Sequence, residues 1–412
     1  MTTPKLPTQE GGGVAHPSLF MWLIMPFGAL SGYLAVSLAY VLTEAKVSAE
    51  AVTALVALSY LPHSWKFFWA PLVDLTLTRK AWYTIGMLGT VLGIFWIGIT
   101  PMTESSMSQL NMLGLVSAFA STLLGMSVDS LMAHATPDHA KGRAAGWFQA
   151  GNLGGSGLGG GAALWMVESG GLTHTGAAAW LAGMCLLCGV AIFFLHEPRV
   201  EARSQTVAQA VHAVWHDLWS IARSRSGALA LLVCFLPIGS GAASNLWSVI
   251  APDWQTPGDT VALINGVAGG LISAAGCLVG GFLCDRMDRK RAYCVFGLLQ
   301  AACALVMGLA PHNEMGYIVF ASLYAFITGL TFAAFSAVVL EAIGKGAAAT
   351  KYNLLASLSN MPIGWMTMLN GWTFGRWGGT AMLAGEAMAG VAALLLFAAV
   401  VRLSSARTGP MR

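Results

Sequence analysis

Several ionisable side chains lie inside hydrophobic stretches of this sequence, where a charge costs at least ~3 kcal/mol unless it is paired or hydrated. Two of them, Lys66 and Asp129, lie at a similar depth in their stretches. A carboxylate that a lysine holds ionised can exchange a proton when the pair is broken. We expect Lys66 and Asp129 to approach each other, with solute or a proton breaking the pair. The alternative is a permanent structural salt bridge.

Other polar groups also occupy hydrophobic stretches. His63 follows Pro62, and it either titrates near neutral pH or, as a neutral ring, bonds a backbone carbonyl that the proline frees. Glu341 is either a counterpart of Asp129 or a solvated group near the end of its stretch. Glu386 lies in the last stretch, where packing, snorkelling and proton binding are all open. The first candidates for hydrogen bonds to a polar solute are Asn152, Asn245 and Asn360.

Two hydrophobic stretches end in an acid that is followed by bases. The first set is Asp74, Arg79 and Lys80, and the second set is Asp285, Arg286, Arg289 and Lys290. An acid at a helix end and bases in the next turn can pair across a closed cytoplasmic face and release when that face opens. We therefore expect these residues to form a cytoplasmic gate. The alternative is that the charges only fix the orientation of the helices.

The two charged sets belong to an internal repeat. The matched pairs, 211 positions apart, are Asp74 with Asp285, Pro26 with Pro237 and Gly28 with Gly239, and Asp129 matches Glu341 at 212. Two similar membrane units in one chain are typical of transporters that bind a solute between their halves, near the middle of the bilayer.

The composition is that of a membrane protein. Of the 412 residues, 56% are hydrophobic and 9% are charged, whereas an ordinary soluble domain is roughly 25% charged. A spanning helix needs about 20 mostly apolar residues. The sequence therefore predicts an all-α membrane protein with twelve transmembrane helices, near 18–43, 50–73, 81–101, 108–134, 143–167, 175–196, 227–250, 260–284, 291–310, 315–342, 348–374 and 378–402.

The expected spans form two pseudo-symmetric halves of six helices. The expected domains are a disordered tail over 1–17, a half over 18–196, a cytoplasmic linker over 197–226, a half over 227–403 and a tail over 404–412. Most of the 21 Lys and Arg residues fall in alternate loops and in the tails, which predicts that both termini are cytoplasmic. The linker has apolar residues at helical spacing, which indicates an amphipathic helix along the membrane surface.

Several other chemistries are disfavoured. The net charge of +3 is too small to suggest nucleic acid, and the seven cysteines lie in or beside apolar stretches without a disulfide framework. The N-terminal residues lack the pattern of a cleaved signal peptide. A solvated polar face explains His212, His216 and Asp217 in the linker better than a metal site does. We expect neither a metal nor another cofactor.

Several segments carry a resemblance to a known family. Gly281 to Arg291, G-F-L-C-D-R-M-D-R-K-R, resembles the loop signature G-x-x-x-D-R-x-G-R-K of the major facilitator superfamily, with Asp288 in place of the second glycine. The segments similar to its AmpG-type group are G-A-L-S-G-Y-L from Gly28, K-F-F-W-A-P-L-V-D from Lys66, V-D at Val128 and A-T-K-Y-N-L-L-A-S-L from Ala349. That group includes muropeptide permeases, which carry two more helices than this chain, acetyl-coenzyme A transporters and siderophore permeases.

A glycine-rich run extends from Gly151 to Gly161. It is not a phosphate-binding loop, because no Lys-Ser/Thr pair follows it and no strand precedes it. Small residues at every fourth place allow close helix packing. In the fold that the resemblance implies, spans five and eight meet between the halves, so we expect Gly155 to lie in a sliding contact there. The matching glycines of span eight are Gly266, Gly270, Gly276 and Gly280.

The resemblance implies a transporter rather than an enzyme, and import follows from the resemblance alone. The proton gradient is the expected driving force, because the chain has no nucleotide-binding domain. The expected partners are protons, lipid and a bulky polar solute such as an anhydro-muropeptide, with a siderophore as the alternative. We expect a monomer in a bacterial inner membrane. Two other classes remain open: a sensor that binds ligand without moving it, and a membrane acyltransferase that uses His134, Asp138 and His139.

Overall fold

The computed structural model describes residues 16–168, 170–195, 197, 215, 216, 219, 223, 225–343 and 348–406. All regular structure in these residues is helical, and they contain no strand. Eight helices in this part of the chain are long and apolar enough to span a membrane. The predicted all-α membrane fold is therefore confirmed, while the count of twelve spans stays a prediction.

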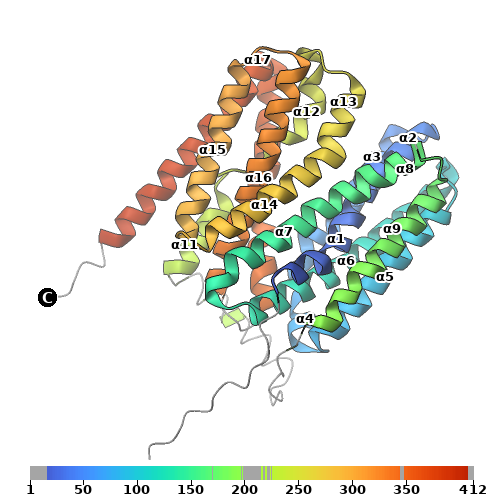
Figure 1. Ribbon diagram of the computed structural model, residues 1–412, viewed down its shortest axis with the longest axis horizontal. Helices are drawn as coiled ribbons and strands as arrows, with labels where there is room; N and C mark the ends of the chain where they lie inside the picture. The colour runs from blue at the N-terminus through green and yellow to red at the C-terminus, as the bar shows by residue number, and fades with distance from the viewer. Residues whose placement is uncertain are drawn as a thin grey trace, which may run out of the picture.

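The first bundle of helices occupies residues 18–194 (Figure 1). Two π-helical segments, Tyr33–Leu38 and Leu158–Ala162, continue α1 into α2 and α7 into α8. The hydroxyl of Thr78 caps α5 by accepting the Ala81 amide at 3.2 Å. The helices are α1 (Ser18–Gly32), α2 (Ala39–Glu44), α3 (Ala49–Trp65), α4 (Ala70–Leu75), α5 (Arg79–Ile99), α6 (Met107–Ala135), α7 (Lys141–Gly157), α8 (Ala163–Glu168) and α9 (His174–Gly189).

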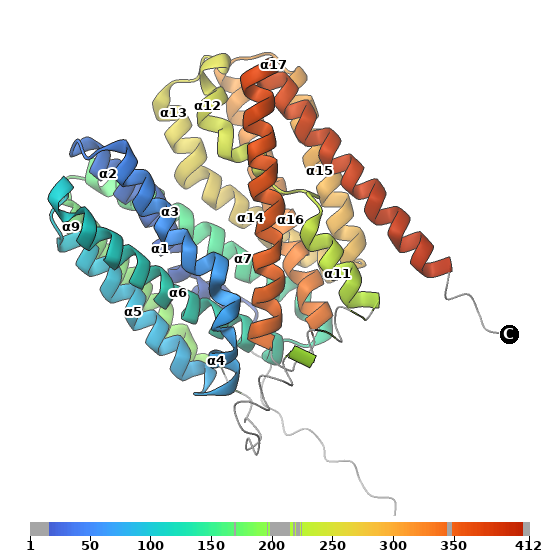
Figure 2. The same cartoon turned by 180° about the vertical axis from the view of Figure 1, so that it is seen from behind.

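The second bundle begins at Arg225. Its last element contains two rods, because the backbone leaves the helical conformation at Gly378 with φ 80°, and Figure 2 shows the chain reversing there. This break lies at the boundary expected between the last two spans. The helices are α11 (Arg225–Phe235), α12 (Trp247–Ile250), α13 (Gly258–Leu263), α14 (Gly269–Cys284), α15 (Arg289–Leu309), α16 (Glu314–Ile343) and α17 (Ala348–Ala406).

Three of the expected spans are interrupted. Within 260–284, the backbone leaves the helical conformation at Gly266. Within 50–73, a 3₁₀ turn at Lys66–Phe68 separates α3 from α4. Within 227–250, the chain between α11 and the 3₁₀ turn Ala242–Leu246 is not helical, and it passes through Gly239 (φ 59°) and Gly241 (φ 70°). Glycine adopts such positive φ values without the steric cost that a Cβ brings.

The repeat is visible in a matched pair of buried contacts. The Tyr83 hydroxyl on α5 donates to the Leu23 carbonyl on α1 at 3.2 Å. The Tyr293 hydroxyl on α15 donates to the Ile238 carbonyl, just after α11, at 2.8 Å. Each bond joins the third expected span of its bundle to the first expected span of the same bundle.

The two bundles contact each other through α7, α14, α16 and the first rod of α17. We call the end that carries residues 136–140 and 285–288 the inner end, and the opposite end the outer end. At the outer end, α2 and α13 lie apart in both views (Figures 1 and 2). Most of the expected linker and both expected tails lie outside the described residues, so the domain boundaries stay predictions.

Candidate functional site

Glycines on α7 and α14 bring the backbones of the two bundles together. A Cβ at Gly146 would lie 2.5 Å from the Cys277 carbonyl oxygen, and a Cβ at Gly157 would lie 3.1 Å from the Gly270 Cα. At Gly146 a Cβ does not fit, and at Gly157 a Cβ fits only if α14 moves by a few tenths of an ångström, so backbone packs on backbone. The fifth and eighth expected spans therefore meet, as predicted.

The prediction for Gly155 is wrong. A Cβ there would lie 2.4 Å from the Met25 carbonyl oxygen of α1, in the same bundle. Likewise, Gly276 and Gly280 face α16 and not α7. The glycines of α7 lie on two faces of the helix, and their spacing alone does not say which face meets the other bundle.

Asp285 joins the bundles at the inner end. Its Oδ1 accepts the Gly142 amide at 2.7 Å, and its Oδ2 accepts the Arg143 amide at 3.1 Å and the Arg143 Nε at 2.8 Å. The carboxylate thus caps the start of α7, where a negative charge is favourable. The expected pairing across the inner face occurs here, with Arg143 as the base. Asp74 lies in α4, and its side chain is outside the described residues.

Arg289 also bridges the bundles. Its guanidinium donates to the Asp138 carbonyl in the first bundle and to Glu341 in its own bundle at 2.9 Å. The Glu341 side chain is 42% exposed, which fits the solvated alternative. Arg286 instead lies over the Phe282 ring, 3.7 Å from its centroid.

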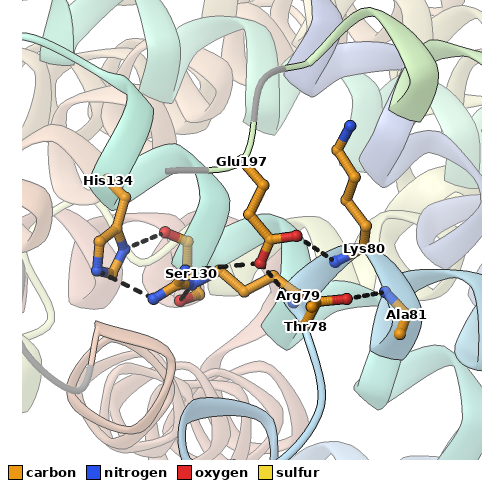
Figure 3. Close-up of polar contacts among 7 residues, drawn as sticks. All are labelled: Thr78, Arg79, Lys80, Ala81, Ser130, His134 and Glu197. Carbon is orange, nitrogen blue, oxygen red and sulfur yellow. Dashed lines mark hydrogen bonds and ion pairs between the residues drawn. The ribbon is translucent and has the colours of Figure 1, made fainter. Parts of the chain in front are cut away.

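The bases after α4 are arranged differently (Figure 3). Arg79 donates from Nε to the Ser130 hydroxyl at 2.9 Å and from Nη2 to the His134 Nε2 at 3.2 Å. The backbone amides of Arg79 and Lys80 donate to the Glu197 carboxylate at 2.8 and 3.4 Å. These contacts tie α5 to α6 and to Glu197, which lies eight residues beyond the end of α9. The prediction that Arg79 pairs across the inner face is therefore wrong in this conformation.

Asp129 is buried on α6, six residues before its inner end. Its Oδ2 accepts the Asn353 Nδ2 of α17 at 3.1 Å, and its Oδ1 has no hydrogen-bond partner among the described residues. Lys66 lies within electrostatic reach, but no ion pair within 4.0 Å joins it to Asp129 in this part of the chain. The structural salt bridge is therefore absent in this conformation, and the approach of the two side chains stays a prediction.

Buried hydroxyls and amides continue this cross-bundle contact. Gln149 on α7 donates to the Ser336 hydroxyl on α16 at 2.6 Å, and Tyr352 on α17 donates to the same oxygen at 3.0 Å. Asn152 donates to Gln149 at 3.2 Å. Asn152 is therefore held in a polar layer between the bundles through Gln149.

His63 lies beside this layer on α3. Its ring meets the Phe27 ring edge-on, with centroids 4.9 Å apart, and the Lys66 ammonium lies 6.0 Å from the same ring. The His63 Nδ1 is buried without a hydrogen-bond partner in the described chain. The alternative in which the ring bonds a carbonyl that Pro62 frees is therefore wrong for this nitrogen.

Two cavities contain the other predicted amides. An open cavity of about 390 Å³ lies between the bundles, and Asn245 lines it while donating to Thr367 at 2.9 Å. A second, small cavity of about 60 Å³ lies within the second bundle and is lined by Asn360 and Ser240. Within the described residues, no three His, Cys, Asp or Glu side chains are grouped to hold a metal ion. The other residues that line the large cavity include Leu153, Ser156, Gly160, Trp247, Asn265 and Thr328.

Sequence reasoning missed two partners of the buried acids. Arg143 is 142 residues from Asp285, and no local spacing connects them. Asn353 is 224 residues from Asp129. A usable signal existed for Asn353, because it lies in the A-T-K-Y-N segment that carries the family resemblance.

Comparisons with known sequences agree with this architecture. The model of the Major Facilitator Superfamily matches residues 19–366. The chain is 26% identical over 328 residues to the anhydromuropeptide permease of Escherichia coli (strain K12), which covers 75% of this chain and 65% of that protein. The same values hold for the permease of Escherichia coli O157:H7. The chain therefore spans less than two thirds of the length of these curated relatives.

Solved structures share the fold. The Escherichia coli fucose:proton symporter has a TM-score of 0.70 at 16% identity, with 93% of this chain and 98% of that chain covered. The human organic anion transporter has a TM-score of 0.69 at 15% identity, with 92% and 98% covered. A proton:xylose symporter has a TM-score of 0.66 at 15% identity, with 92% and 94% covered. This chain belongs to the major facilitator superfamily, and it is an integral membrane transporter rather than an enzyme.

Proposed function

We propose that this protein is a proton-coupled transporter that imports a bulky polar solute of the anhydro-muropeptide type by alternating access. The observation that carries the proposal is the position of Asp129. This buried carboxylate lies near Lys66, has one oxygen without a hydrogen-bond partner among the described residues, and contacts the other bundle through Asn353. Protonation of Asp129 is thereby linked to the contact between the bundles.

The link has a simple physical basis. A hydrogen bond to an ionised carboxylate is roughly twice as strong as a bond between neutral groups. A proton on Asp129 therefore weakens the bond from Asn353 and removes the attraction to Lys66. Both changes loosen α6 from α17 at the inner end. In this mechanism proton binding favours opening of the inner end, and Lys66 favours release of the proton once that end is open.

The inner contacts support a closed state at that end. The Asp285–Arg143 pair and the bond from Arg289 to the Asp138 carbonyl both cross between the bundles. We propose that these contacts form and break as the transporter alternates, with the inner end facing the cytoplasm of a bacterium and both termini on that side. The halves over 18–196 and 227–403 would then move about the glycine contact of α7 and α14.

The cavity between the bundles supports a solute of small-molecule size. Sites for small molecules measure roughly 300–1,000 Å³, and this cavity, at about 390 Å³, lies within that range. Asn245 and Asn265 are exposed and offer amides, whereas Trp247, which also lines the cavity, is only 3% exposed. The curated relative named anhydromuropeptide permease favours a muropeptide over a siderophore.

The test is substrate-driven proton uptake in liposomes that contain the purified protein and a trapped pH dye. Anhydro-muropeptide added outside should acidify the interior, while a ferric siderophore should not. The Asp129→Asn variant should bind the muropeptide without acidification, and Glu44→Gln, which removes an exposed carboxylate, should behave as the wild type. Acidification by the siderophore alone would change the solute class, and acidification by Asp129→Asn would exclude this carboxylate as the proton carrier.

A further inference from the structure

Glu386 is a buried carboxylate in the second bundle that the proposed mechanism does not use. It lies on the second rod of α17, eight residues after Gly378, or about 12 Å along the helix. Its side chain accepts the Tyr324 hydroxyl at 3.0 Å and the Ser240 hydroxyl at 3.2 Å, and it also accepts the Asn370 amide. Only 5% of the residue is exposed. The last expected span therefore points this acid into the bundle and not into lipid.

The groups around Glu386 include no base. The three donors are neutral, Tyr324 is the one titratable side chain among them, and no ion pair to Glu386 occurs in the described residues. The nearest packed element, α15, contributes the neutral Gln300 to this region, where it donates to Thr328 at 2.9 Å. Burial penalises an unpaired charge. A proton is the smallest ligand that removes this charge.

Asn370 is suited to both charge states of the acid. Its Nδ2 donates to the carboxylate, while its Oδ1 is buried without a hydrogen-bond partner among the described residues. A half-turn of the amide about its terminal bond places Oδ1 against the carboxyl group. Asn370 can therefore donate to an ionised Glu386 and accept from a protonated one.

Two routes lead from Glu386 to the cavities. Ser240 lines the cavity of about 60 Å³ and lies in the non-helical segment 236–241. The Tyr324 ring meets the Trp247 ring edge-on with centroids 5.0 Å apart, and Trp247 lines the cavity of about 390 Å³. The acid is thus one residue away from the smaller cavity and two residues away from the larger one.

The internal repeat shows that this arrangement is particular to the second bundle. The register that matches Pro26 with Pro237 places Ala29 opposite Ser240 and Leu30 opposite Gly241. In the first bundle α1 runs through these positions as a continuous helix, without a hydroxyl and without a break. The hydroxyl that reaches Glu386 and the break that presents it therefore occur together.

We infer that Glu386 is a second proton-binding site, separate from Asp129 and loaded from the smaller cavity by way of Ser240. A proton from cavity water forms an O–H bond on the carboxylate, which becomes neutral, and hydroxide or its buffered equivalent stays in the water. The neutral acid binds Ser240 less strongly, because the charge-assisted bond is lost. Segment 236–241 is then free to shift. Tyr324, which also bonds Glu386, contacts Trp247 and so links protonation of the acid to the position of Trp247.

The experiment is infrared difference spectroscopy of the purified protein during a pH titration, without solute. The wild type should show the C=O band of a buried carboxyl group that appears on acidification. Glu386→Gln should remove this band, and Asp129→Asn and Glu44→Gln should retain it. Tyr324→Phe should move the band to higher frequency, because a hydrogen bond to the carboxyl group is lost.

Each outcome decides the inference. Identical titrating bands in the wild type and in folded Glu386→Gln would overturn it. If Glu386→Gln does not fold, an unchanged band frequency in Tyr324→Phe would overturn it instead. Suppression of the band by sodium chloride but not by choline chloride would identify a metal-cation site and reject a proton site. No muropeptide enters the measurement, so its result is separate from that of the transport assay.

Discussion

The substitution Asp285→Asn tests whether the inner contact holds the bundles together. Asp285 accepts three hydrogen bonds from Gly142 and Arg143, and its side chain is 9% exposed. Asparagine keeps the shape but loses the charge, and a charge-assisted hydrogen bond contributes about 1.5–3 kcal/mol. Arg143 is 48% exposed, so water recovers part of this loss. We therefore expect a cost near the lower bound, ~1.5 kcal/mol, or about tenfold in the equilibrium between closed and open inner ends.

Hydrogen–deuterium exchange measured by mass spectrometry reports this equilibrium. In Asp285→Asn, amides over 141–150 should exchange about tenfold faster, and amides over 351–358 should follow because α17 faces α6 at the same end. The matched control is Asp288→Asn, which removes an acid three residues away. Asp288 caps α15 within its own bundle by accepting the Arg291 amide at 2.9 Å. This control should affect exchange only near 289–293.

Two results would refute the reasoning. Equal exchange over 141–150 in Asp285→Asn and the wild type would mean that the ion pair contributes nothing to closure. Faster exchange confined to Gly142 and Arg143, with 351–358 unchanged, would mean that Asp285 is a local helix cap and not part of a gate.

Three further predictions concern transport and stability. Gly157→Ala should slow turnover in liposomes with little change in melting temperature, because the Cβ meets α14 of the other bundle 3.1 Å away; unchanged turnover would contradict a moving contact. Gly155→Ala should lower the melting temperature, because overpacking against α1 costs ~1–3 kcal/mol. Calorimetry measures this change. The control is Gly114→Ala, because a Cβ at Gly114 meets nothing within 4 Å. Arg79→Gln should destabilise the first bundle by loss of the side-chain bonds to Ser130 and His134 and of the ion pair with Glu197, but should leave exchange over 351–358 unchanged.

Much of the architecture could be predicted from composition and spacing. Long apolar stretches indicate membrane helices, because a chain in lipid must satisfy its backbone hydrogen bonds internally. The match of Pro26 with Pro237 and the two charged loops indicate that the helical unit is duplicated. The interruption at 236–241 could have been suspected from Pro237, Gly239 and Gly241. It was not predicted, because proline and glycine at such positions do not always break a helix. Pro26 and Gly28, at the matching positions of the first bundle, lie in an unbroken helix. Hydrophobicity alone does not distinguish these two outcomes.

The candidate site was less predictable, since its contacts join residues far apart in the chain. Asp129 was identified from its cost in hydrocarbon, whereas its partner Asn353 depends on how α6 and α17 meet. Arg79 and Arg289 look alike in sequence, yet Arg79 bonds within its own bundle and Arg289 reaches the other. The difference arises because Glu197 and His134 lie near Arg79 and compete for it. Such competition is a property of the assembled fold.

The broken seventh span also bears on the ancestry of the chain. If one helical unit was duplicated, the two copies have since diverged in backbone path: the first keeps Leu30 inside a continuous helix, and the second leaves the helical conformation at Gly241. The copies are therefore no longer interchangeable. A chimaera with α1 in place of segment 225–250 would restore the symmetry of the ancestor, but it would remove the break that presents Ser240 to Glu386.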